Sequence, residues 1–250
     1  MIKMLIATPW IGEFGWELMR WQGYLRHLSK SYDTTVVLGA VDFYLYRDFA
    51  QRKITGIPDM ETIRDTIIDY VHPSNTLCRG HIEQDFIKLG KPLRWSQKRI
   101  VIHARKDKRE VLGDRNWPRE RWDELVGLIL NRFSDVSIYT IGTYESAMDL
   151  NGVTDIRGSN LEITADLLAS SGLCLGPSSG SMHFASLCGC PQIVWTDTGT
   201  WRVGDVKATN RQRYETLWNP FKTPAYVIDN EGWQPSVEIV FRKIKEVYSK

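Results

Sequence analysis

The residues best suited to chemistry lie in a turn between an apolar run and a helix of small residues. The run Leu173–Leu175 ends in Gly176-Pro177-Ser178-Ser179-Gly180, and the residue spacing after it predicts a helix. Free backbone N–H groups and the helix dipole at such a start attract anions, and Gly180 lets a ligand come close. We expect Ser178 and Ser179 to cap the helix. Because capped helix starts are more often structural than phosphate-binding, the turn alone indicates only a candidate anion site.

Two basic residues follow another strand pattern, where a bound anion would need countercharge. Arg105 and Lys106 come directly after the apolar run that ends in His103. Their place at the carboxyl end of a strand favours anion binding over a solvated run of charges. The N–H group of Ser181 and the ring of His183 belong to the first turn of the predicted helix and join this set. A packing role explains His183 equally well.

The loop after the first strand carries the candidate general base. Its sequence is Gly12-Glu13-Phe14-Gly15, and it lies at the sheet edge where α/β proteins place ligands. Glu13 is our first candidate for removing a proton from a hydroxyl group. Glu17, one helical turn further on, is the second candidate and Asp107 is the third. A tight structural turn explains the loop about as well.

The order of strand and helix patterns predicts an α/β fold with two Rossmann-like, doubly wound parallel-sheet domains. We expect one domain over residues 1–92 and a second over residues 93–235, and the first is small for a Rossmann-like domain. We expect residues 236–250 to form a terminal helix that packs back toward the first domain. The predicted strands are Lys3–Pro9, Thr34–Leu38, Thr66–Val71, Arg99–His103, Val136–Ile141, Thr154–Ile156, Leu173–Leu175, Gln192–Thr196 and Ala225–Ile228. The predicted helices are one from Trp16 onward, Asp42–Phe49, Gly80–Leu89, Arg119–Phe133, Leu161–Ser171, one after Gly180 and Val237–Tyr248.

Composition places the chain among ordinary globular proteins. Of its 250 residues 42% are apolar and 25% are charged, and the net charge is only +2. No apolar run approaches the roughly 18 residues of a membrane span, and the N-terminal run lacks the features of a signal peptide. The four cysteines lack metal-site spacing, so we expect them to pack in the core of a cytoplasmic protein without integral membrane association. They are Cys78, Cys174, Cys188 and Cys190.

The second half of the sequence resembles the heptosyltransferase-like glycosyltransferases of family 9. The similarity covers roughly residues 99–200. It rests on the strand ending in His103 with its basic loop, on Trp117-Pro118-x-Glu120-x-Trp122-x-Glu124-Leu125, and on Gly176-Pro177, Ser179-Gly180, Met182-His183, Ala185, Gly189 and Pro191. Ser178 stands where the family usually has Asp. The first half matches only through its first loop, where family members place an acidic base.

The resemblance implies a GT-B fold and an inverting, metal-independent transfer of a sugar from a nucleoside-diphosphate sugar to a hydroxyl acceptor of saccharide or lipopolysaccharide type. The nucleotide sugar is a co-substrate, and neither a cofactor nor a metal is expected. Glu13 would be the base, with Glu17 as the alternative. The donor phosphates would bind Arg105, Lys106, Ser178, Ser179, Gly180, Ser181 and His183; the nucleoside Thr140, Gly142 and Glu162; and the acceptor Gly12, Phe14, Gly15, Trp16 and Trp201.

Other interpretations stay open at this point. His103-x-Arg105 also resembles the phosphate-binding arginine motif of fucosyltransferases. The Trp- and Arg-bearing segment 201–218 and a pI near 8.3 fit a modified base in nucleic acid as the acceptor. A nucleotide- or glycan-binding module without activity, or an α/β scaffold, would share the same fold. The sugar, the nucleotide and the oligomeric state are not specified by any motif.

Overall fold

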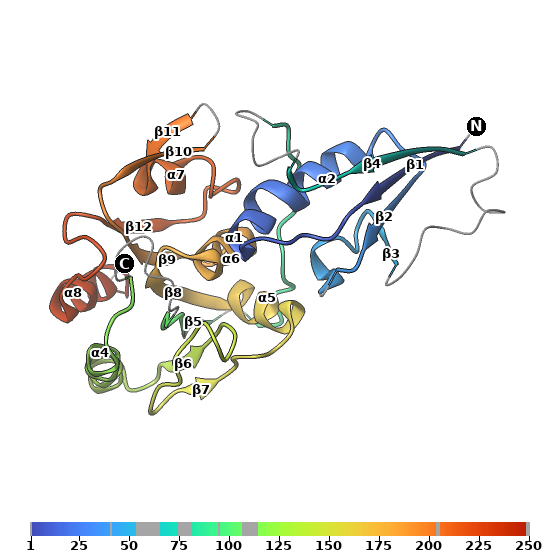
Figure 1. Cartoon of the computed structure of the whole chain (residues 1–250). Helices are drawn as coiled ribbons and strands as arrows, with labels where there is room; N and C mark the ends of the chain where they lie inside the picture. The colour runs from blue at the N-terminus through green and yellow to red at the C-terminus, as the bar shows by residue number, and fades with distance from the viewer. Residues whose placement is uncertain are drawn as a thin grey trace. The chain divides into compact units, whose positions relative to one another are not determined.

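The computed structural model describes residues 2–40, 42–53, 66–74, 82–94, 96–106, 115–203 and 206–248. The chain forms two compact units. The first comprises Met1–Ile87 with Trp201–Lys207, and the second comprises Lys88–Thr200 with Ala208–Lys250. Each unit is built on its own parallel sheet (Figure 1).

The first unit has a four-stranded parallel sheet in the order β3-β2-β1-β4. Met4 and Ile6 of β1 and Val36 of β2 form a buried apolar cluster in this unit. The central strand β1 is paired on both sides, so its last residues reach the edge of the sheet in a fixed register. The strands are β1 (Ile2–Ala7), β2 (Thr34–Leu38), β3 (Gln51–Lys53) and β4 (Thr66–Val71).

A continuous helical segment follows β1, and its middle is wound more widely than an α-helix. It runs through α1 (Phe14–Trp16), the π-helix η1 (Glu17–Trp21) and α2 (Gln22–Ser29). In the π-turn the N–H group of Gln22 donates to the carbonyl of Glu17, five residues back. Turns of this type are rare and often occur at functional sites, which makes this segment notable.

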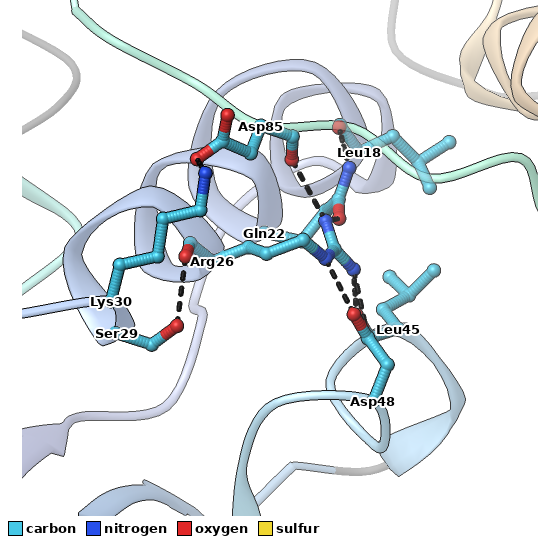
Figure 2. A network of polar contacts seen from close by, with 8 residues as sticks. All are labelled: Leu18, Gln22, Arg26, Ser29, Lys30, Leu45, Asp48 and Asp85. Atoms are coloured by element: carbon cyan, nitrogen blue, oxygen red, sulfur yellow. Dashed lines mark hydrogen bonds and ion pairs between the residues drawn. The ribbon is translucent and has the colours of Figure 1, made fainter. Parts of the chain in front are cut away.

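Side chains around Arg26 hold the π-turn in place (Figure 2). Gln22 donates from Nε2 to the carbonyl oxygen of Leu18 over 2.9 Å, and its Oε1 accepts from Arg26. The buried Arg26 guanidinium also donates to both carboxylate oxygens of Asp48 and to the carbonyl oxygens of Leu45 and Asp85. Because a buried cation with fully used donors is costly to disturb, this network fixes η1 and α2 to the segment that follows β2.

Two helix predictions for the first half differ from the structure. The segment expected as a helix over Asp42–Phe49 forms only the short 3₁₀ helix η2 (Phe43–Leu45), capped by the Asp42 side chain. The helix expected over Gly80–Leu89 is wrong for residues 82–89, and the first two residues lie outside the described part. There the N–H group of Asp85 donates to Gly23 and that of Leu89 to Leu187, so neighbouring elements take the bonds that a helix would make within itself.

The second unit has a six-stranded parallel sheet in the order β12-β9-β8-β5-β6-β7. Strand β8 is central and fully buried, between β5 and β9. The sheet consists of β5 (Ser96–Ile102), β6 (Ser137–Thr140), β7 (Thr154–Asp155), β8 (Ser171–Pro177), β9 (Gln192–Trp195) and β12 (Ala225–Ile228). Its helices are α4 (Arg119–Arg132), α5 (Leu161–Ala169), α6 (Gly180–Cys188), α7 (Asn210–Glu215) and α8 (Val237–Tyr248).

The terminal helix α8 packs in the second unit, whereas we expected it to return to the first domain. Val240 and Ile244 belong to the same buried cluster as Ile129 of α4 and Trp195 of β9. Its apolar stripe is therefore used to cover this sheet. The sequence analysis also missed β10 (Thr200–Val203), β11 (Val206–Thr209) and α7, because it assigned the stretch after Thr200 to a loop.

Candidate functional site

The turn from β8 into α6 lies at the carboxyl edge of the second sheet, as the sequence predicts. The N–H group of His103, just after β5, donates to the carbonyl of Leu175 in β8 over 2.9 Å. On the other side Ser178 donates its N–H group to Trp195 of β9, also over 2.9 Å. These ladder bonds place the ends of three neighbouring strands around the start of α6. This is the place where open α/β sheets bind ligands.

The expected capping by serine side chains is wrong. Ser179 is the N-cap residue, yet its hydroxyl makes no capping bond and lies 3.0 Å from Nδ1 of His103. The hydroxyl of Ser178 accepts instead from the phenol of Tyr214 over 3.2 Å. Both serines are thus held by side chains from distant parts of the chain. The N–H groups of Met182 and His183 donate to the backbone carbonyl of Ser179, whereas no serine hydroxyl caps the N–H groups of Gly180 and Ser181.

Gly180 and Ser181 provide the backbone donors of the candidate anion site. Their N–H groups donate no hydrogen bond to the residues that the structure describes, and both residues are half-buried. The backbone of Ser179 interacts with the phenol of Tyr214, and binding of a ligand by its N–H group stays a prediction. Two aligned N–H groups at the start of a nine-residue helix are suited to a phosphate oxygen.

Arg105 is buried two residues after His103, the residue that bonds to Ser179. Its Nη1 donates to Asn116 Oδ1 over 2.7 Å, and its own N–H group donates to the carbonyl of His103. Burial, and next the Arg105 charge, lower the pKa of His103 to about 4, so this imidazole is neutral at pH 7. The neighbouring Lys106 is half-buried and donates its N–H group to Ser146. The structure therefore brings a fixed cation to the His103–Ser179 pair.

His183 lies in an aromatic cluster that the sequence analysis did not recognise. Its ring centroid is 4.4 Å from that of Trp218 and 5.4 Å from that of Tyr214, and Arg213 lies over the Trp218 ring. Burial lowers the pKa of His183 to about 3. The ring is therefore neutral and can offer a phosphate no positive charge. The Trp- and Arg-bearing composition of residues 201–218 was the available signal, but we had connected it with the acceptor.

The residues predicted to contact the nucleoside all lie in the second unit. Thr140 ends β6 and is fully buried, and its hydroxyl donates to Asp155 over 3.2 Å. Gly142 has a φ of +121°, and a side chain there would meet the His103 ring at 3.2 Å. Glu162 lies in the first turn of α5, where Asn160 caps the helix. Thr140 and Gly142 thus share the sheet edge of His103 and Ser179.

The candidate general base Glu13 is exposed at the N-cap of α1 in the first unit. Its neighbours Phe14 and Gly15 are half-buried, and Gly12 is exposed. Trp16 of α1 meets Trp201 with ring centroids 6.0 Å apart and planes at 78°, and Trp201 is 37% exposed. The structure therefore brings the residues predicted to contact the acceptor to one end of β1, with Glu13 among them.

Glu17 is in a different environment from Glu13. Its carboxylate accepts a 2.5 Å hydrogen bond from the phenol of Tyr46, which is itself buried. Burial, with a smaller contribution from Asp42, raises the pKa of Glu17, and the Tyr46 hydrogen bond opposes that rise. A carboxyl group with a raised pKa is a better proton acceptor near neutral pH, so Glu17 remains a candidate base. The third candidate, Asp107, lies outside the described residues.

The described part of the chain contains no cluster of three or more His, Cys, Asp or Glu side chains that could hold a metal ion. Its cysteines Cys174, Cys188 and Cys190 are free and buried, and burial raises the pKa of each thiol. Cys78 lies outside the described residues. No described helix combines the length and the apolar character needed to cross a membrane.

Comparison with known proteins identifies the fold. The E. coli heptosyltransferase WaaC with ADP matches at a TM-score of 0.56 and 12% identity, over 98% of this chain and 100% of that chain. E. coli ADP-heptose lipopolysaccharide heptosyltransferase II matches at 0.58 and 13%, over 98% of both chains. A family 9 glycosyltransferase from Veillonella parvula matches at 0.58 and 12%, over 98% of this chain and 97% of that chain. The chain thus shares the two-domain GT-B fold of these enzymes.

Neither a family model nor a curated protein sequence matches this chain.

Proposed function

We propose that this protein is a glycosyltransferase that moves a sugar from a nucleoside-diphosphate sugar to a hydroxyl group of a saccharide acceptor. One observation carries the proposal: the N–H groups of Gly180 and Ser181 at the start of α6 donate to no described residue, and His103, which bonds to Ser179, lies close enough to the buried Arg105 for that charge to lower its pKa. The shared fold supports it, because one solved example is a heptosyltransferase with ADP. Backbone dipoles and a fixed cation suit the diphosphate of such a donor.

The proposed reaction is a single displacement. The acceptor oxygen forms a bond to the anomeric carbon while the bond from that carbon to the phosphate oxygen breaks. The acceptor hydroxyl gives its proton to Glu13, and the nucleoside diphosphate leaves with the electron pair. The donors at the start of α6, with Arg105 and Lys106, stabilise the charge that develops on the phosphate. One displacement inverts the anomeric configuration, and neither a metal nor a cofactor takes part.

The nature of the first loop favours a saccharide over nucleic acid as the acceptor. The segment from Thr8 to Glu17 carries two carboxylates, Glu13 and Glu17, and no basic residue. The indole rings of Trp16 and Trp201 suit a neutral sugar ring, and carboxylates in the same loop repel a phosphate backbone. A modified base in nucleic acid is the second candidate acceptor. The exposed Trp201 ring supports it, because a base can stack there.

A cytoplasmic location is part of the proposal, because the free and buried cysteines of the second unit suit a reducing compartment.

A thermal-shift panel of ADP-, UDP-, GDP- and CMP-sugars tests the proposal. One nucleotide class should raise the melting temperature, since ligands that bind only the folded state stabilise it. A preference for GDP-sugars would identify the fucosyltransferase-like alternative. The stabilising donor is then incubated with oligosaccharide acceptors and with duplex DNA containing hydroxymethylated bases. Glycosylated oligosaccharide supports the proposal and glycosylated DNA supports the second candidate. Binding without any product would indicate a binding module, and no shift with any donor would indicate a scaffold.

A further inference from the structure

We propose that Trp10 is a positioning residue for Glu13, a role that rests on the proposed function. Trp10 is half-buried and lies in the loop between β1 and α1. Its side chain turns back along the loop, and the indole Nε1 donates to the carbonyl oxygen of Glu13 over 3.2 Å. The indole N–H thus makes a specific bond to the residue that we propose as the base.

The Glu13 carbonyl oxygen is held by three donors. Besides the Trp10 indole, the backbone N–H groups of Trp16 and Glu17 donate to it over 3.0 Å and 3.2 Å. The backbone donors alone would fix the first turn of α1, as in any helix. The indole adds a bond from the loop side, where the chain is still extended at Glu13 with ψ at 139°. This bond therefore ties the incoming loop to the start of the helix.

Gly12 makes room for the indole. A Cβ atom at this position would lie 2.7 Å from Cζ2 and 3.0 Å from Cε2 of Trp10. Cβ atoms essentially never come closer than 3.0 Å to such a neighbour, so any larger residue would displace the ring. The backbone φ angle of Gly12 is not positive, so its backbone conformation does not require glycine. The close approach of the Trp10 ring explains the glycine instead.

The other side of the indole rests on the core of the first unit. Trp21 of η1 is fully buried, and its ring centroid lies 6.3 Å from that of Trp10, with the planes tilted by 33°. The π-turn that carries Trp21 is held by Gln22 and Arg26 (Figure 2). A continuous set of contacts therefore runs from the buried Arg26 network through Trp21 and Trp10 to Glu13.

This arrangement gives an exposed loop a fixed conformation. Ile11 is 80% exposed and Glu13 is also exposed, so burial in the core does not fix this part of the loop. A base that removes a proton must stay within hydrogen-bond reach of its target, and displacements of about 1 Å are enough to slow an enzyme strongly. Loss of the Trp10 contact should therefore lower kcat and leave binding of the donor unchanged.

Two single variants and one double variant test the proposal. Trp10→Phe keeps an aromatic ring but removes the indole N–H group, and we expect kcat to fall about fivefold, the equivalent of about 1 kcal/mol. Gly12→Ala should lower kcat by a similar or larger factor. In a Trp10→Ala background the same Gly12→Ala change should have no further effect, because the ring that it meets is gone. Gly127→Ala is the matched control, since nothing lies within 4 Å of a Cβ at Gly127.

The outcomes separate this inference from the proposed function. If Glu13→Gln abolishes turnover while Trp10→Phe and Gly12→Ala keep the wild-type kcat, Trp10 does not position the base, although the proposed function stands. If Gly12→Ala lowers kcat equally with and without the Trp10 ring, the inference is also overturned. If Glu13→Gln retains turnover, Glu13 is not the base, and the proposed role of Trp10 in positioning it is overturned as well. The donor thermal shift, measured for every variant, shows that each one folds and binds.

Discussion

The two strand–turn–helix junctions that carry the candidate chemistry are similar in outline and opposite in character. Both follow a central strand of a parallel sheet, β1 in the first unit and β8 in the second, and both contain glycine near the start of a helix. At β8 the turn is enclosed by neighbouring strands, and its serines are held by His103 and Tyr214. At β1 the turn is exposed and carries the carboxylate of Glu13.

This difference suits the two junctions to the two separate tasks of the proposed reaction, which are binding an anion and accepting a proton. An anion requires N–H donors, and those of Gly180 and Ser181 donate to no residue that the structure describes. The N-cap residue of α1 is itself an exposed carboxylate, Glu13, so this junction is suited to accept a proton from a neutral group. A strand–turn–helix junction can therefore suit either anion binding or proton acceptance, and the side chains at the turn determine which of the two it suits.

The largest expected effect comes from removing the carboxylate of the exposed junction. Glu13→Gln should lower kcat by about 10²- to 10⁴-fold, the usual contribution of a general base, and leave the donor-induced thermal shift intact. Steady-state kinetics of the purified protein measure this. Glu124→Gln, at an exposed position of α4, serves as the matched control and should keep full activity. A Glu13→Gln protein with normal turnover would transfer the role to Glu17.

The next effect concerns the cation of the enclosed junction. Arg105→Gln should lower kcat/KM on the order of 100-fold, because the charge that develops on the leaving diphosphate loses a fixed countercharge. Arg105 is buried, so urea unfolding is measured alongside to separate lost stability from lost catalysis. Arg105→Lys, which retains the charge, should recover part of the activity. Equal losses in both variants would mean that the Asn116 contact, and not the charge, matters.

Tyr46→Phe tests the second carboxylate of the exposed junction through the pH dependence of stability. Burial raises the pKa of Glu17 in the folded protein, so the stability that this group contributes is present below its ordinary value of 4.5 and is lost as pH rises through the folded pKa. Removing the Tyr46 hydrogen bond raises the folded pKa further. The variant should therefore lose about 1 kcal/mol more of its unfolding free energy at pH 8 than at pH 4.5.

Urea unfolding at the two pH values measures this difference. A Tyr46→Phe/Glu17→Gln double variant is the control, because without an ionisable group at position 17 the extra loss at pH 8 should disappear. A loss that is the same at both pH values would show that Tyr46 acts only through packing.

The smallest effect is expected at the N-cap of the enclosed junction. Ser179→Ala removes the hydroxyl that bonds His103 and leaves a buried imidazole nitrogen without that partner. We expect the Kd of the donor to rise about fivefold, as for the loss of one neutral hydrogen bond. Titration calorimetry measures it, with Ser137→Ala at an exposed position of β6 as the control. An unchanged Kd would mean that the backbone N–H groups are sufficient.

Local patterns specified much of the fold. The strands Thr34–Leu38, Thr66–Val71 and Ala225–Ile228 and the helix Val237–Tyr248 have the predicted bounds, because runs of apolar residues with a clear period need no distant partner to be recognised. The β8–α6–β9 unit was also predicted, with its turn at the residues seen in the structure. At residues 82–89 the prediction failed, because backbone groups there bond to other elements.

The candidate site depended much more on contacts between distant residues. The sequence by itself determined which residue types stand at the ends of the strands, and hence that an anion site and a carboxylate loop were to be expected. Only the tertiary structure decided that Ser179 bonds to His103, 76 positions away, and that Tyr46 bonds to Glu17. It also decided that His183 is buried as a neutral ring among aromatic residues. The reason is physical: burial and hydrogen-bond partners set the charge and direction of a polar side chain, and both come from segments that the local pattern does not contain.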